Sequence, residues 1–160
     1  MLSLAPITWD NFWKVIDLKV APQQASYLPE VAVYMAQSYV NLSLDYSDQC
    51  LAIYDEDLLI GFTKIVFVPK GEKVYHMDVD SYMIDAFLID DVYQHKGYGV
   101  NAFALILENI QSRDEKDVQI SLTCYEKNVV AKKMFTSFGF QKVGLKDQKH
   151  DLFIYLKEKQ

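Results

Sequence analysis

DAFLIDDVYQHKGYGV, the sequence of residues 85–100, decides the fold of this chain. A strand-like apolar run ends in a polar turn with the pattern Gln-x-x-Gly-x-Gly, and an amphipathic helix follows at once. Such a turn presents several unpaired backbone N–H groups to one point, and the helix dipole adds positive potential there. Glycines let an anion approach the main chain closely, and Lys96 supplies a positive charge. The pattern predicts a seat for a phosphate or pyrophosphate group.

A dinucleotide site is the first alternative, because Gly97 to Ala102 also fits G-x-G-x-x-G/A. That motif requires a tight strand-to-glycine turn and an acidic residue about 20 positions on. Here seven residues separate Ile89 from Gly97, and the later segment SLTC, residues 121–124, contains no carboxylate. The spacing therefore disfavours a dinucleotide.

The pattern from Gln94 to Gly99 resembles motif A of the GNAT superfamily of N-acetyltransferases, and NVVAKKMFTSFGF, residues 128–140, resembles its motif B. QASYL at residues 24–28 and MIDAFLI at residues 83–89 are similar to the spermidine/spermine acetyltransferase group. The resemblance implies a single domain over residues 1–160 in the α/β (α+β) class. Its mixed, mostly antiparallel sheet would have six to seven strands, splayed between the fourth and fifth, with four helices. Family members often form dimers, so a homodimer is expected.

The same resemblance implies acetyl-coenzyme A as co-substrate and assigns its contacts. Main-chain N–H groups of the fourth strand, those of Leu88 and Ile89 or their neighbours, would hold the thioester carbonyl and the pantetheine amides. The loop would hold the pyrophosphate, and motif B would add two further contacts. The expected cofactor-binding residues are Phe87, Leu88, Ile89, Gln94, His95, Lys96, Gly97, Tyr98, Gly99, Val100, Asn128 and Phe135.

Asp85 is the expected catalytic base. An alkylamine is almost entirely protonated near neutral pH, so its deprotonation must be assisted, and a carboxylate can do this directly or through water. Asp85 lies in the strand expected beside the thioester and aligns with the acidic residue of the polyamine group. The alternative is an aspartate that points to solvent from a strand.

Phe135 departs from the family pattern, because many members carry a proton-donating tyrosine at this position. Three explanations stay open: water protonates the departing thiolate, another side chain replaces the tyrosine, or the protein binds acyl-coenzyme A and catalyses poorly. The nearby alternatives are Tyr125, Tyr98 and Cys124, and Tyr125 is taken as the second catalytic residue.

The amine site is expected on the N-terminal segment. Polyamines need spaced carboxylates and aromatic faces for their ammonium groups. Tyr27, Glu30 and Tyr34, together with Asp85, are the expected substrate-binding residues, and Asp78 and Asp80 could extend the channel. Tyr34 and the following Tyr39 could instead be core or interface aromatics, and the two aspartates an exposed edge.

Composition and charge limit the classes of partner that this protein is expected to bind. The net charge of −6 argues against a nucleic-acid partner and favours encounter with cationic molecules. The two cysteines lie in apolar runs, as reduced cytosolic thiols do, and no His or Cys pattern predicts a metal. Neither a secretory leader nor a membrane-spanning run is evident. We therefore expect a soluble, cytoplasmic protein.

Strands are expected over residues 2–7, 50–54, 58–68, from about 74 or 81 to 89, 118–124, 140–145 and 151–157. Helices are expected over 9–19, capped by Thr8, over 29–40, after the glycines, and after Asn128 with Val130, Met134 and Phe138 facing the core. The function expected is acetylation of a small primary amine, with spermidine or spermine favoured. The alternatives are acetylation of a protein N-terminus, lysine, amino acid or antibiotic amine, or a weakly catalytic acyl-coenzyme A-binding module.

Overall fold

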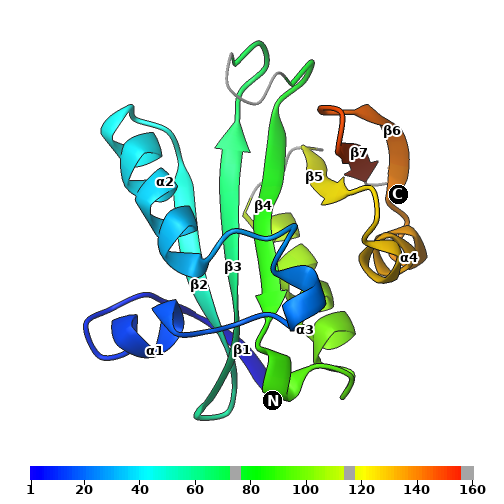
Figure 1. Cartoon of the computed structure of the whole chain (residues 1–160). Coiled ribbons are helices and arrows are strands. Elements are labelled where there is room, and N and C mark those ends of the chain that lie inside the picture. Colours follow the sequence, from blue (N-terminus) through cyan, green and yellow to red (C-terminus); the bar gives the residue numbers. More distant parts are fainter. Residues whose placement is uncertain (73–76, 114–117, 156–160) are drawn as a thin grey trace.

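The computed structural model describes residues 1–72, 77–113 and 118–155. Within them seven strands form one sheet in the order β1-β2-β3-β4-β5-β7-β6 (Figure 1). All neighbouring strands are antiparallel except β4 and β5, which are parallel. The strands are β1 (Leu2–Pro6), β2 (Asp48–Asp55), β3 (Leu58–Val68), β4 (Ser81–Ile89), β5 (Gln119–Tyr125), β6 (Gln141–Leu145) and β7 (His150–Tyr155). The predicted mixed, mostly antiparallel sheet is confirmed.

Helices cover both faces of this sheet (Figure 1). Val15 and Val31 pack with Phe62 on one face, whereas Phe103 and Ile106 pack with Ile84 on the other. Burial on both faces explains why β3 reads as a nearly continuous apolar run. The α-helices among the described residues are α1 (Phe12–Ile16), α2 (Val31–Ser43), α3 (Tyr98–Gln111) and α4 (Val129–Ser137), with short 3-10 turns η1 (Pro22–Gln24) and η2 (Asp91–Tyr93).

β4 and β5 diverge toward their C-terminal ends. They pair only where residues 81–84 lie beside residues 119–122. Beyond that point β4 continues along β3, and β5 continues along β7. The predicted divergence is therefore confirmed, and we call the unpaired halves, residues 85–89 and 123–125, the splay.

Several expected boundaries were wrong. α1 begins after Asn11, not Thr8, and is only five residues long, since Trp9 and Trp13 remain exposed and little of the segment packs on the core. α2 runs from Val31 to Ser43 rather than over 29–40. In α4 the side chain of Val130 is 76% exposed, so the predicted core stripe was wrong there. The alternative start of β4 at residue 74 and the expected end of β7 at 157 lie outside the described residues.

Candidate functional site

Asp85 occupies a β-bulge at the start of the splay. In the β3–β4 register Lys64 lies opposite Ala86 and Ile65 lies opposite Ile84, which leaves Asp85 without a partner. A bulge redirects a side chain and bends its strand, and bulges are frequent beside functional sites. The bulge therefore coincides with the point at which β4 leaves β5.

Main-chain groups of β4 alternate between β3 and the splay. Asp90 N donates to Ile60 O of β3, whereas Ile89 O accepts a hydrogen bond from the Gln94 side chain on the opposite side. Successive residues of a strand direct their N–H and C=O groups to opposite edges. Phe87 and Ile89 therefore direct their N–H groups into the splay, and Leu88 directs its own toward β3. Of the two amides that the sequence favoured, only that of Ile89 faces the splay.

The loop before α3 and the first turn of α3 together present an uninterrupted row of main-chain donors. Among the described residues, no acceptor receives a hydrogen bond from the N–H groups of residues 95–100. His95 and Gly97 both have positive φ, 59° and 83°, which turns consecutive amides toward one side of the loop. Gly97 is also the N-cap of α3, where the helix dipole is positive. This donor set fits a pyrophosphate group.

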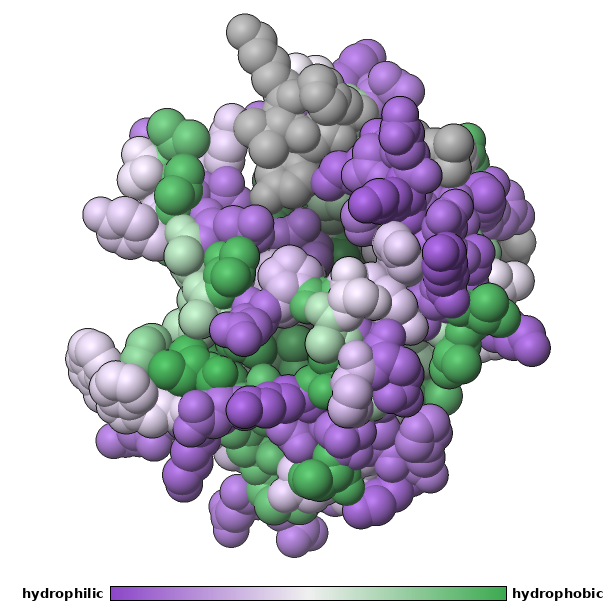
Figure 2. Space-filling model, viewed as in Figure 1, coloured by the Kyte–Doolittle hydropathy of each residue, from purple (hydrophilic) through white to green (hydrophobic). Residues whose placement is uncertain are grey.

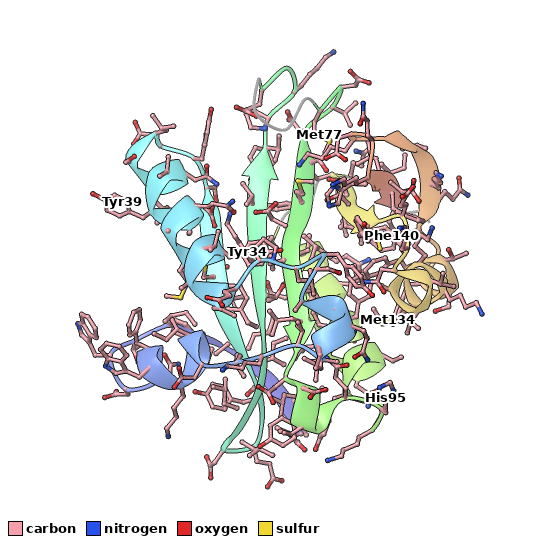
Figure 3. All side chains as sticks on the ribbon, viewed as in Figure 1. Tyr34, Tyr39, Met77, His95, Met134 and Phe140 are labelled. Atoms are coloured by element: carbon pink, nitrogen blue, oxygen red, sulfur yellow. The ribbon has the colours of Figure 1, made fainter. Side chains whose placement is uncertain are left out.

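The side chains of this segment form hydrogen bonds with other parts of the protein or lie exposed. Gln94 Nε2 donates to Gln24 Oε1 at 2.8 Å and to Ile89 O at 2.9 Å. Lys96 Nζ donates to Val92 O, and the Tyr98 hydroxyl donates to Asp55. The His95 side chain lies on the outside of the protein (Figure 3). The loop therefore offers an anion its main chain, while Gln94 braces the loop against η1 and the end of β4.

The segment between α1 and α2 closes over the splay. Lys19 N donates to Asp90 Oδ2, and Asp91 N donates to Lys19 O. Farther along, the rings of Tyr27 and Tyr125 stack with centroids 4.9 Å apart and planes inclined by 16°. The structure thus brings the expected substrate residue Tyr27 against the expected catalytic residue Tyr125, across about 100 residues of sequence.

Tyr125 has a further aromatic neighbour in His150, whose ring meets it edge-on at 5.8 Å. His150 Nδ1 lies 2.9 Å from the carboxylate of Asp147, which fixes the imidazole against Tyr125. Cys124, by contrast, is buried, and burial raises the pKa of its thiol to about 11. The Tyr98 hydroxyl is engaged by Asp55. Of the three alternatives to a motif B tyrosine, Tyr125 is the one whose ring lies beside the splay without being committed to a carboxylate.

The two motif B residues differ in accessibility. Asn128 is the N-cap of α4, and its Oδ1 accepts a hydrogen bond from Ala131 N. Phe135 is only 7% exposed and packs against Phe103, with ring centroids 5.1 Å apart. Phe135 is therefore a core residue, and its ring packs α4 against α3.

A buried polar cluster lies between α2 and the sheet, and sequence reasoning did not anticipate it. Lys64 Nζ, fully buried, donates to Asp85 Oδ2 at 2.7 Å and lies 3.4 Å from Asp48 Oδ2. Asp48, also fully buried, accepts hydrogen bonds from Ser38 Oγ and Asn41 Nδ2 of α2. The side chain of Asp85 is 15% exposed. We call Asp48, Lys64 and Asp85 the charge cluster.

The other expected substrate residues are distributed around this cluster. Tyr34 is 7% exposed and lies between α2 and the central strands (Figure 3). Burial, and then the charge of Asp85, raises the pKa of its phenol, so the hydroxyl stays protonated. Glu30 is exposed immediately before α2, and Asp80 is committed to the turn by accepting a hydrogen bond from Lys70 N. Asp78 is exposed near the same turn.

No group of three or more His, Cys, Asp or Glu side chains among the described residues is arranged to hold a metal ion. No helix in that part of the chain is both long and apolar enough to cross a membrane.

Known proteins share both the sequence pattern and the fold. The sequence model of the Acetyltransferase (GNAT) family matches residues 12–140. The chain is 27% identical over 145 residues to the spermine/spermidine N(1)-acetyltransferase of Bacillus subtilis, covering 88% of each protein. An aminoglycoside acetyltransferase in complex with coenzyme A superposes with a TM-score of 0.76 at 15% identity, over 99% of this chain and 96% of that one.

A spermidine N-acetyltransferase chimera of Vibrio cholerae SpeG and hSSAT superposes with a TM-score of 0.71 at 16% identity, over 97% of this chain and 95% of that one. The family model matches most of the chain, and the two superposed structures share its fold over nearly its whole length. This chain is an acetyltransferase and belongs to the GNAT family.

Proposed function

We propose that this enzyme transfers the acetyl group of acetyl-coenzyme A to a primary amine of a small polycation, with spermidine and spermine as the favoured acceptors. The observation that carries the proposal is the position of Asp85. Its partly exposed carboxylate stands at the start of the splay, and the row of loop donors at residues 95–100 stands at the other end. The anion-binding amides and an ammonium-binding carboxylate thus lie at the two ends of the strand segment that would hold the thioester.

The residues of the splay have distinct roles in this proposal. The N–H groups of residues 95–100 hold the pyrophosphate, and those of Phe87 and Ile89 bind the pantetheine amides and the thioester carbonyl. Asp85 accepts the ammonium group of the acceptor and passes its proton to water, which frees the nitrogen lone pair for attack on the carbonyl carbon. The C–N bond then forms, the nitrogen loses its second proton to water, and the C–S bond breaks to give the neutral amide and the thiolate.

The departing thiolate takes a proton, and Tyr125 is the donor that we propose. Phe135 has no proton to give and is buried in the core. Tyr125 ends β5 inside the splay and is held between Tyr27 and His150. Asn128 could contact the cofactor with its remaining amide atoms while it caps α4.

Aromatic and acidic groups support the choice of a polycation. Tyr27 comes from the segment that closes over the splay and Tyr34 from the first turn of α2, and aromatic faces attract ammonium groups. Glu30 stands exposed between them in sequence, where a second ammonium of an elongated substrate could be bound. The similarity to the Bacillus subtilis spermine/spermidine enzyme supports the same choice.

Two substitutions test these roles. Asp85→Asn should lower kcat/KM for spermidine by about a hundredfold or more, as loss of a general base does, with acetyl-coenzyme A affinity unchanged by calorimetry. Tyr125→Phe keeps the stacked ring and should lower kcat alone. Unchanged turnover in Asp85→Asn would refute the base assignment, and unchanged kcat in Tyr125→Phe would leave water as the proton donor.

The proposal also includes a cytoplasmic location, a single domain over residues 1–160, no nucleic-acid or membrane partner, and a homodimer. The exposed apolar side chains on α1 and α2 support the dimer, and Figure 2 shows pale and green atoms over these helices at the left edge. They include Trp13 on α1 and Val33 and Tyr39 on α2, and Trp9, just before α1, is exposed as well. Light scattering at micromolar concentration tests it, with a mass near twice that of the 18.5 kDa chain expected.

A further inference from the structure

The charge cluster beneath α2 contains more negative than positive groups. Two of its members are carboxylates, Asp48 and Asp85, and one is an ammonium, Lys64. With each group in its usual ionised form, the three side chains carry one net negative charge. Because Lys64 and Asp48 are fully buried, solvent screens this charge poorly, and only Asp85 opens toward the outside.

Among the described residues, Lys64 forms ion pairs with Asp48 and Asp85, and no other lysine, arginine or histidine forms one with either carboxylate. The sequence of α2, VAVYMAQSYVNLS, contains no ionisable carboxylate, lysine or arginine, and it contributes only neutral donors to Asp48. Burial raises the pKa of the Tyr34 phenol and of the Cys50 thiol, so both stay neutral. Elements β2, β3 and β4 supply the three charges themselves.

Asp85 has one oxygen available for a second cation. Its Oδ2 accepts the hydrogen bond from Lys64, and no donor among the described residues bonds to Oδ1. At neutral pH an alkylamine is an ammonium ion. A substrate ammonium on Oδ1 would complete the charge balance of two carboxylates and two cations.

We propose that the excess charge of this cluster is what binds the acceptor's ammonium group, so that the buried Asp48 sets amine affinity without touching the substrate. Lys64 is then a positioning residue that holds Asp85 at the bulge. This inference rests on the proposed function and adds Asp48 and Lys64 to the residues that determine its specificity. A buried unit charge within about 10 Å changes the binding of a cation by roughly tenfold at an effective dielectric constant near 20.

Asp48→Asn is the main test, with Ser38→Ala as its matched control. Both substitutions weaken the contact between α2 and β2, but only Asp48→Asn removes a charge. The Ser38 hydroxyl can reverse its hydrogen bond and accept from the new amide, so we expect the variant to fold. Its KM for spermidine should rise roughly tenfold, with kcat and the KM for acetyl-coenzyme A within about twofold of wild type. Ser38→Ala should keep the wild-type KM for spermidine.

The double variant Asp48→Asn, Lys64→Met separates charge from packing. It is more disruptive than either single change, yet it restores one net negative charge at Asp85. We expect its KM for spermidine to return toward the wild-type value while kcat falls, because Asp85 has lost the group that orients it. A structural role for the cluster predicts instead that the second substitution raises KM further.

The outcomes distinguish this inference from the proposed function. If wild type acetylates spermidine and Asp48→Asn has the same KM as Ser38→Ala, the inference is refuted and the proposed function stands. If the double variant has a higher KM than Asp48→Asn, the inference is refuted as well. If the wild-type protein acetylates no amine, both the proposed function and this inference are refuted.

Discussion

Removing the Gln94 side chain tests whether this residue acts by bracing the loop or by touching the cofactor. Gln94→Leu deletes two hydrogen bonds, to Gln24 Oε1 at 2.8 Å and to Ile89 O at 2.9 Å. Each neutral bond contributes about 1 kcal/mol net, so the braced conformation loses about 2 kcal/mol. If the donors at residues 95–100 converge only in that conformation, affinity for acetyl-coenzyme A falls by up to about 30-fold.

Gln24→Leu is the matched control, because Gln24 lies 70 residues away in sequence and contributes only its side chain to the brace. It removes one of the two Gln94 bonds, together with the bond that Ala21 N donates to Gln24 Oε1. Titration calorimetry with acetyl-coenzyme A and a thermal melt measure both variants. Bracing predicts weaker binding in both. Wild-type affinity in Gln94→Leu would refute it, and weak binding in Gln94→Leu alone would indicate direct contact with the cofactor.

Three further predictions concern the loop, the core and the acid stability. Gly97→Ala should lower stability by about 1–2 kcal/mol, since φ is +83° there and only conformational strain opposes the methyl group, whereas Gly99→Ala should not; equal melting temperatures would contradict this. Phe135→Tyr should lower the melting temperature without raising kcat, because the 7% exposed ring would bury a hydroxyl; a gain in kcat would show that the ring reaches the thiolate. Lys142 holds the pKa of Asp151 below its usual range, so this pair stabilises the protein above about pH 4 and less below it. The melting-temperature difference between wild type and Lys142→Met should therefore shrink as the pH falls through that region. A difference that stays constant with pH would refute the contribution of this ion pair.

The order of the elements could be predicted because their periodicity is local. Gly97 before α3 and Asn128 before α4 mark helix starts through their own backbone and side-chain chemistry, and both helices begin at these residues, although α3 already includes Gly99. Boundaries failed where tertiary packing decides. The helix expected over 9–19 shrank to five residues, and Val130 turned outward because the stripe of α4 runs through its neighbours Ala131 and Met134.

The candidate site shows the same contrast between parts made by one contiguous segment and parts assembled by tertiary packing. The anion loop is a contiguous segment, so its sequence shows it. The orientation of the β4 amides depends on a bulge at Asp85, which no local pattern reveals, so the sequence could not distinguish the amide of Leu88, which faces β3, from those of its neighbours. The charge cluster joins α2, β2, β3 and β4. Its one sequence signal was Lys64 itself, a lone charge inside the apolar run of β3, where a lysine can be buried only if a carboxylate meets it.

The central claim is that a polyamine is the acceptor and that the splay performs the transfer. Thiol release from acetyl-coenzyme A, measured with spermidine, spermine, a lysine peptide, free amino acids and an aminoglycoside, tests it most directly. We expect kcat/KM for spermidine or spermine to exceed that for every monoamine and peptide by about tenfold or more, as differential binding of a second ammonium would give. Equal or faster turnover of the peptide or the amino acids would contradict it.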